Sequence, residues 1–142
     1  MSELRFELPI PPSVNHLYRT FTNKQGRRIR VHTADAKKWF SHAGWPIKDA
    51  INRSRWKPLD EKCVVDLWVW WPDRHTRDCD NLNKALMDAL KMYDVVTDDH
   101  FCLPRWQDYD YDKLRPRVEV CVWKQVGSPT TGGTSTRETV AS

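Results

Sequence analysis

Four stretches of the chain have the apolar or alternating pattern that is typical of β-strands. They span residues 4–10, 62–71, 101–111 and 117–124. Within 62–71 the side chains divide between two faces, with Cys63, Val65, Leu67, Val69 and Trp71 on one and Val64, Trp68 and Trp70 on the other. Both faces are apolar apart from Asp66. A strand with two apolar faces is covered on both, so we expect this one at the centre of a sheet.

Two further stretches have the 3.6-residue spacing of amphipathic helices. We expect Thr33 to cap the first, whose apolar positions are Ala36, Trp39, Phe40, Ala43, Ile47, Ala50 and Ile51. Pro46 should kink or split this helix near its middle, because proline lacks the backbone N–H and clashes with the preceding turn. We expect Asp80 or Asn81 to cap the second helix. Its apolar flank holds Leu82, Ala85, Leu86, Ala89, Leu90 and Tyr93, and its polar flank Asp80, Asn81, Lys84, Asp88 and Lys91.

The order of these elements predicts the fold class. Between the first strand and the first helix, residues 23–26 resemble a turn and residues 28–31 the second arm of a short basic hairpin. The whole order predicts a single α+β domain over residues 1–126, with one mixed sheet and two main helices packed on it. From residue 127 the composition changes to Gly, Ser, Thr and Pro. We therefore expect residues 127–142 to form a disordered tail.

The composition excludes several classes of protein. The chain has 142 residues, a mean hydropathy of −0.73 and no apolar run near the ~18 residues that a membrane helix requires. Its N-terminus does not resemble a signal peptide, so we expect a cytoplasmic protein. Its four cysteines show no CxxC spacing. We therefore expect reduced thiols, with neither a zinc site nor a disulfide framework.

The basic residues are grouped in a way that suits an anionic polymer. The net charge is only +4. The basic positions, however, cluster in three groups: Arg19, Lys24, Arg27, Arg28 and Arg30; Lys37 and Lys38; and Arg74, His75 and Arg77. This distribution favours binding to a nucleic acid. The alternative for the first group is a solvated basic surface without a ligand.

Acidic residues supply the candidate chemistry. Asp78 and Asp80 lie two residues apart where the strand pattern gives way to the helical one, so both can point the same way. Asp98 and Asp99 follow the helix, and the chain can fold them back toward the first pair. Three or four carboxylates with Lys84 form an oxygen-ligand set suited to Mg²⁺ and phosphoryl chemistry. Each residue alone has a simpler interpretation: a helix cap, a solvated lysine or a turn.

Two motifs resemble those of the RusA family of Holliday junction resolvases. The first is Pro72-Asp73-Arg74-x-x-Arg77-Asp78-x-Asp80-Asn81-Leu82-x-Lys84-Ala85, followed by Asp88-Ala89-Leu90 and Asp98-Asp99. The second is Pro11-Pro12-Ser13-x-Asn15-x-x-Tyr18-Arg19 near the N-terminus. Together they extend the resemblance from about Phe6 to about Val122.

The resemblance implies roles for individual residues. Asp78, Asp80 and Asp99 correspond to catalytic aspartates that hold Mg²⁺, for which Mn²⁺ can substitute, and Lys84 joins them as a catalytic residue. The implied DNA-binding residues are Arg77, Arg74, Lys84, Arg19, Asn15 and Arg28. Asp98 and Asp88 are additional acidic candidates. Family members are often carried by phages, so the implied setting is a bacterial or phage-infected cell.

These observations lead to one hypothesis and two alternatives. The hypothesis is a Mg²⁺-dependent endodeoxyribonuclease that resolves four-way DNA junctions by paired nicks during recombination or repair. Because one chain offers one carboxylate site and a junction needs two cuts, we expect a homodimer. The first alternative is a branched-DNA-binding protein without catalysis, and the second is a structural or packaging-associated protein. No membrane or small-molecule cofactor is expected.

Overall fold

The computed structural model describes residues 3–124, and its centre is a four-stranded mixed sheet. The strands run in the order β1-β6-β4-β5, where β4 and β5 are parallel and the other neighbours antiparallel. Their bounds are β1 Glu3–Leu8, β4 Cys63–Trp71, β5 Cys102–Tyr111 and β6 Arg117–Lys124. The predicted central strand is confirmed, because β4 lies between β6 and β5. The α+β class with a mixed sheet and two helices is confirmed as well.

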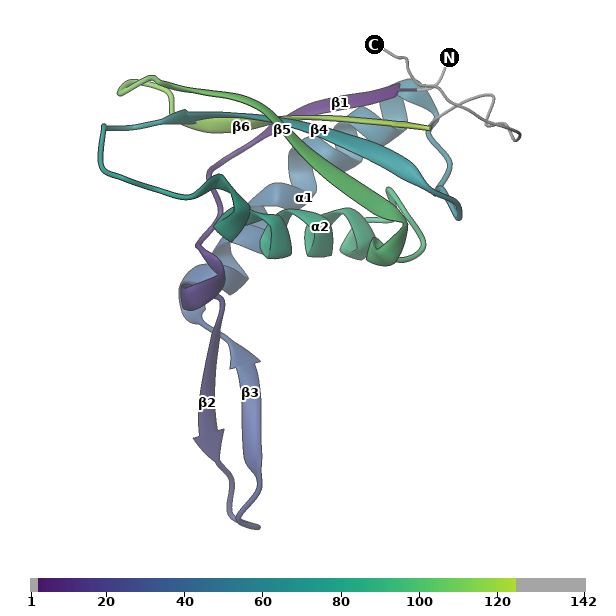
Figure 1. Ribbon diagram of the computed structural model, residues 1–142. Coiled ribbons are helices and arrows are strands. Elements are labelled where there is room, and N and C mark those ends of the chain that lie inside the picture. The colour runs from purple at the N-terminus through teal and green to yellow at the C-terminus, as the bar shows by residue number, and fades with distance from the viewer. Residues whose placement is uncertain (1–2, 125–142) are drawn as a thin grey trace, which may run out of the picture.

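Two helices, α1 (Ala34–Ser54) and α2 (Asn83–Met92), cover one face of this sheet (Figure 1). The side chains of β4 on that face are buried: Cys63, Val65, Leu67, Val69 and Trp71. On the other face Trp68 and Trp70 are half-buried. The alternation predicted for residues 62–71 is therefore confirmed, and the core lies between the sheet and the two helices.

Of the predicted kink or split of α1 at Pro46, the split is wrong, since the helix is continuous from Ala34 to Ser54. Proline removes one hydrogen bond to the carbonyl four residues earlier, which belongs to His42. His42 is exposed, so that carbonyl can bind water instead. The buried stripe continues on both sides of Pro46 and holds both halves against the sheet. The predicted cap is confirmed: the Thr33 hydroxyl accepts a hydrogen bond from the Ala36 N–H.

The two helices meet at a glycine. A Cβ atom at Gly44 of α1 would lie 2.7 Å from the ring of Tyr93, which follows α2. The Tyr93 hydroxyl donates a 2.6 Å hydrogen bond to the Phe40 carbonyl. Glycine thus allows a close approach of α1 to the end of α2, and this contact fixes the position of α2 and of the segments that flank it.

A separate two-stranded hairpin projects from this body (Figure 1). It pairs β2 (Tyr18–Thr22) with β3 (Arg28–His32), and we call it the arm; the four-stranded sheet with its two helices is the body. The turn predicted at 23–26 is present: the Asn23 side chain accepts hydrogen bonds from the N–H groups of Gln25 and Arg27. None of the arm's strand residues is buried. The predicted basic hairpin is therefore confirmed.

Two further predictions concern a membrane span and the C-terminal tail. None of the helices within residues 3–124 is long and apolar enough to span a membrane. The predicted tail at 127–142 lies outside the described residues.

Candidate active site

The candidate site begins where β4 ends and the chain enters the 72–78 loop. Arg77 holds this loop together: one of its guanidinium nitrogens lies 2.7 Å from the Asp73 carboxylate and also donates to the Asp73 carbonyl. Hydrogen bonds from Arg77 and from the His75 N–H keep the pKa of Asp73 well below its usual value. The same guanidinium lies 5.1 Å from the Trp71 ring centroid. Arg77, predicted to bind DNA, thus also orders the loop that leads to Asp78.

Asp78 caps the short 3-10 helix η2 (Cys79–Leu82). Its carboxylate accepts a 3.0 Å hydrogen bond from the Asp80 N–H. Residue 83 begins α2 directly, and the residue before it offers no side-chain cap. The prediction that Asp80 or Asn81 caps the second helix is therefore wrong. An aspartate side chain readily accepts a hydrogen bond from the backbone N–H two residues later, and Asp78 does so at the start of η2, before α2 begins.

The second acidic group lies further along α2. Lys84 and Asp88, one turn apart on its polar side, form a 3.1 Å ion pair. This hydrogen bond raises the pKa of Lys84. The segment η3 (Asp99–Phe101) packs against α2. Burial, followed by the carboxylates of Asp98 and Asp88, raises the pKa of Asp99. The structure therefore brings Asp99 close to Asp88 and Lys84.

Asp98 and Asp99 have different environments. Asp98 caps η3, accepting a 3.1 Å hydrogen bond from the His100 N–H. This bond lowers the pKa of Asp98 to about 2. For Asp99, burial and then the neighbouring carboxylates disfavour the charged form and raise the pKa. Of the two, Asp99 is the one whose environment a bound cation would most improve.

The described carboxylates do not gather into a single cage. Within residues 3–124, no three His, Cys, Asp or Glu side chains lie close enough together to hold a metal ion. Two clusters are present instead, one at Asp78 and Asp80 and one at Asp88 and Asp99. The donor set nevertheless fits magnesium, because all donors are oxygens and Mg²⁺ is usually held by one or two carboxylates, waters and substrate phosphates.

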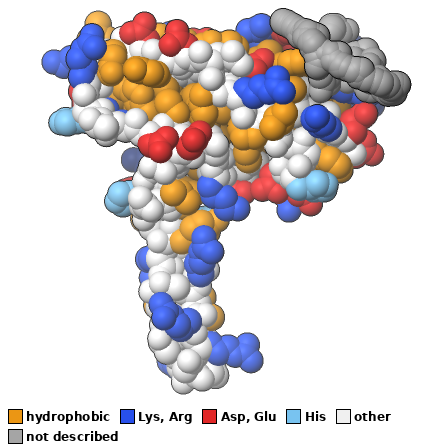
Figure 2. Space-filling view, in the orientation of Figure 1, with side chains coloured by type: hydrophobic (Ala, Val, Ile, Leu, Met, Phe, Trp, Pro, Cys, Tyr) orange, Lys and Arg blue, Asp and Glu red, His pale blue; other side chains and the backbone are white. Residues whose placement is uncertain are grey.

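The predicted DNA-binding residues fall into two places. Arg19 and Arg28 lie on the arm, away from the carboxylates. Asn15 lies in the short 3-10 helix η1 (Val14–His16), which contacts both η2 and α2. Arg74 lies in the 72–78 loop, with its guanidinium 4.1 Å from the Tyr111 ring centroid. Figure 2 shows acidic side chains where the body meets the arm and basic side chains along the arm.

Two hollows border the 72–78 loop, and both reach Asp78. One, of about 470 Å³, lies toward β5 and is lined by Trp71, Arg74, His75, Thr76, Arg77, Asp78, Cys79, Tyr109 and Tyr111. The other, of about 540 Å³, lies toward the segment before η1 and is lined by Ile10, Pro11, Ser13, Trp71, Thr76, Arg77, Asp78, Asn81 and Leu82. Asp78 thus borders open space on two sides.

Sequence reasoning did not assign three residues near this site. Asn83 at the start of α2 accepts a 2.7 Å hydrogen bond from the Trp106 indole N–H and so ties α2 to β5. Tyr109 and Tyr111 line the first hollow. Two tyrosines at alternate positions of a strand indicate a shared face, but only the structure shows that this face borders the 72–78 loop.

Comparison with known proteins identifies the family. A search of curated proteins gave no match. The family described as Endodeoxyribonuclease RusA matches residues 9–123. This range contains both motifs, both acidic clusters and the arm. Because the match covers most of the 142 residues, the chain belongs to the RusA family of endodeoxyribonucleases.

Proposed function

We propose that this protein is a Mg²⁺-dependent endonuclease that resolves four-way DNA junctions by paired nicks. The observation that carries the proposal is the position of Asp99: η3 packs against α2 in an endodeoxyribonuclease of this family, and burial, followed by the carboxylates of Asp98 and Asp88, raises the pKa of Asp99. A divalent cation would neutralise the charge of these carboxylates and fits their oxygen donors.

Each acidic and basic residue has a proposed role. Asp78 and Asp80 in one cluster and Asp99 in the other are the proposed metal ligands, completed by waters and a substrate phosphate, with Asp88 as an additional carboxylate. When bound, the ion supplies an activated water and neutralises phosphoryl oxygens. Lys84, held by Asp88, presents a positive charge to the phosphate that enters the site. Arg77 keeps the 72–78 loop in place and so positions Asp78.

The arm and the 72–78 loop would bind the DNA backbone. Arg19 and Arg28 extend from the body on the arm, and Arg74 lies on the loop beside Asp78. Asn15 lies in η1, which contacts both β2 of the arm and α2, and it would contact the strand near the cut. Basic side chains on both sides of the carboxylates offset the repulsion between those carboxylates and DNA phosphates.

The proposed active form is a homodimer. A four-way junction has two-fold symmetry, and its resolution needs cuts on two opposing strands. A closed two-fold dimer would present two identical sites related in the same way. Sedimentation at low micromolar concentration should give twice the 16.8 kDa chain mass. Mixing with excess Asp80→Asn before assembly should convert paired nicks into single nicks.

The decisive experiment is cleavage of an end-labelled four-way junction with EDTA, Mg²⁺ or Mn²⁺, beside a linear duplex of the same sequence. We expect paired nicks in the junction with either metal and none with EDTA or in the duplex. Tight junction binding without any nick would instead identify a non-catalytic branched-DNA-binding protein. Absence of junction binding even at low salt would point to a structural or packaging-associated protein.

A further inference from the structure

Of the two hollows that Asp78 lines, the one toward β5 is lined by side chains that the chemistry at the carboxylates does not require. Its volume of about 470 Å³ falls within the range of about 300–1,000 Å³ that is common for ligand sites. One wall is aromatic, formed by Trp71, Tyr109 and Tyr111. The 72–78 loop adds Arg74 and Arg77 to the lining, with their guanidinium groups over the Tyr111 and Trp71 rings. A pocket with aromatic and guanidinium walls suits a planar ligand that carries negative charge nearby.

The tyrosines face this pocket because of a β-bulge. Up to Leu67 the two parallel strands pair without interruption, and Leu67 lies opposite Trp106. The register then shifts by one residue on β5, so that Tyr109 lies opposite Val69 and Tyr111 opposite Trp71. Paired residues share a face, so the shift brings both tyrosines to the face of Trp71. Without the bulge they would point to the other side of the sheet.

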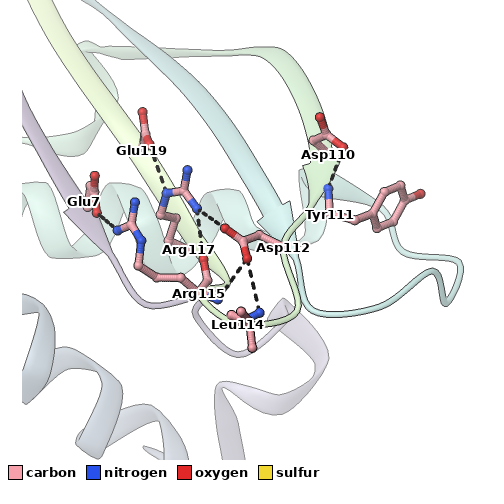
Figure 3. A network of polar contacts seen from close by, with 8 residues as sticks. All are labelled: Glu7, Asp110, Tyr111, Asp112, Leu114, Arg115, Arg117 and Glu119. Atoms are coloured by element: carbon pink, nitrogen blue, oxygen red, sulfur yellow. Dashed lines mark hydrogen bonds and ion pairs between the residues drawn. The ribbon is translucent and has the colours of Figure 1, made fainter.

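Hydrogen bonds and an ion pair in the turn after β5 hold the aromatic wall of the pocket in place. The Asp112 N–H bonds to the Trp71 carbonyl, and the Asp112 carboxylate accepts from the N–H groups of Leu114 and Arg115. Arg117 joins the same carboxylate at 3.1 Å. Figure 3 shows the contacts of the Asp112 carboxylate, with the Tyr111 ring pointing away from them. The end of β5 is thus fixed, and its aromatic rings are free of the polar contacts that order the turn.

One ring in the pocket remains available for a ligand. Arg74 covers the Tyr111 ring, and Tyr109 meets Tyr111 nearly at a right angle, with ring centroids 6.3 Å apart. Tyr109 is 58% exposed, so its ring is open to a ligand. Exposed aromatic rings beside basic side chains are the features with which proteins stack unpaired bases.

We propose that this hollow binds a nucleobase, the one next to the phosphate held at Asp78, and that Tyr109 is the ring on which it stacks. The proposal rests on the proposed function, because it requires a DNA strand at the carboxylates. Asp78 lines the same hollow, so the base and the phosphate of one nucleotide reach both places together. Bases at the crossover of a four-way junction lie at a break in stacking and are displaced more easily than those within a duplex. The pocket therefore favours branched over continuous DNA.

The test is a double-mutant cycle in which the Tyr109 ring and one DNA base are removed separately and then together. Junctions carrying a single abasic residue at each position around the crossover are bound to wild type and to Tyr109→Ala in EDTA, and anisotropy gives the affinity. One abasic position should weaken wild type by about five- to a hundred-fold, as expected for loss of one stacked base. Tyr109→Ala should bind the intact junction equally weakly and lose nothing further with that abasic junction.

Two variants serve as controls. Tyr109→Phe keeps the ring and should bind as wild type does. Leu114→Ala removes a nearby side chain that is 94% exposed but lies outside the hollow, and it should have no effect. Two results would exclude the base pocket. One is that the fold-losses in junction affinity from Tyr109→Ala and from each abasic position multiply when the two changes are combined. The other is that Tyr109→Ala binds the junction as tightly as wild type does.

Cleavage in Mg²⁺ separates this proposal from the proposed function. A protein that shows the non-additive cycle in EDTA but never nicks the junction would retain the base pocket and lose the nuclease assignment. A protein that makes paired nicks at the wild-type rate with Tyr109→Ala, and whose losses multiply, would retain the nuclease and lose the pocket.

Discussion

The body and the arm are stabilised in different ways. In the body, alternate residues of β1, β4 and β6 are buried against the two helices or against neighbouring strands, and the core residues of β4 are almost fully buried. In the arm no strand residue is buried, and the exposed positions include Arg19, Arg28 and Arg30. A two-stranded hairpin is only marginally stable in water. The body is thus organised by its own core, whereas the arm's exposed surface is available to a partner.

The arm is nevertheless anchored at its base. Thr33 donates through its N–H to the Leu17 carbonyl and through its hydroxyl to the His16 carbonyl. His32 stacks between Tyr18 and Phe40, with ring centroids 5.1 and 4.9 Å away. These contacts fix the direction in which the arm leaves α1. The basic residues are therefore carried at a set position relative to the carboxylates.

The largest effect should come from the body. Asp99→Asn keeps the shape of the side chain but removes a negative oxygen ligand. If metal binding provides several kcal/mol of transition-state stabilisation, junction cleavage should fall about a thousand-fold or more. Junction affinity should remain, because the arm is untouched. Gel-based cleavage rates and anisotropy measure the two quantities, and Asp108→Asn, an exposed carboxylate opposite Trp68 on the sheet face away from the helices, is the matched control.

The same variant also tests the electrostatics of the site. The pKa of Asp99 is raised in the folded state, so the charged form of Asp99 opposes folding. Protonation of Asp99 therefore stabilises the fold, and this stabilisation is lost as the pH rises through the folded-state pKa. Asp99→Asn should therefore melt at or above the wild-type temperature at pH 7, and the difference should shrink as the pH falls. A lower melting temperature at neutral pH would instead assign Asp99 a stabilising ion pair.

A smaller effect should come from the helix contact in the body. A Cβ at Gly44 meets the Tyr93 ring, which its hydroxyl holds in place. Gly44→Ala should cost about 1–3 kcal/mol of unfolding free energy through overpacking, offset in part by alanine's advantage of about 1 kcal/mol in helices. Urea denaturation measures this cost. Tyr93→Leu should make the alanine harmless, and equal losses with and without the tyrosine ring would contradict the contact.

The contrast between buried and exposed regions explains how far the sequence predicts each of them. Burial imposes a periodic pattern, so the strand at 117–124 was predicted with its observed bounds and the one at 62–71 to within one residue. The cap of the second helix was not predicted correctly, because a local bond of Asp78 competes with the helical pattern there. Side-chain bonding of this kind leaves no periodic signal.

The candidate site was predicted in its residue types and only partly in its arrangement. Both acidic pairs were identified from their spacing. The approach of Asp99 to Asp88 depends on where η3 packs against α2, which no local pattern specifies. The aromatic pocket depends on a one-residue register shift between parallel strands. Long-range register of this kind is decided by the assembled sheet.

A third prediction concerns the charge on the arm. Replacing Arg19, Arg27 and Arg28 with Gln should reduce the slope of log affinity against log salt by about 2–3, the number expected for three lost phosphate contacts. Thermal stability should change little, because these side chains are exposed. The matched control replaces Arg53, Lys57 and Lys62, which have the same total charge and lie at the opposite end of α1 or beyond it (Figure 1). Equal losses from both sets would mean that net charge alone binds the DNA.

The smallest effect should be confined to the arm itself. The Arg30 guanidinium lies 3.8 Å from the Tyr18 ring centroid and joins the two strands of the arm. An exposed contact of this kind contributes about 0.5–1 kcal/mol, and a hairpin outside the core can open without unfolding the body. Arg30→Gln should therefore speed amide hydrogen exchange in β2 and β3 by roughly two- to five-fold and leave the melting temperature unchanged. Arg30→Lys keeps the charge and should give an intermediate rate. If Arg30→Gln lowers the melting temperature of the whole protein and speeds exchange in β4 as well, the arm and the body unfold together, and the arm cannot be treated as a separate unit.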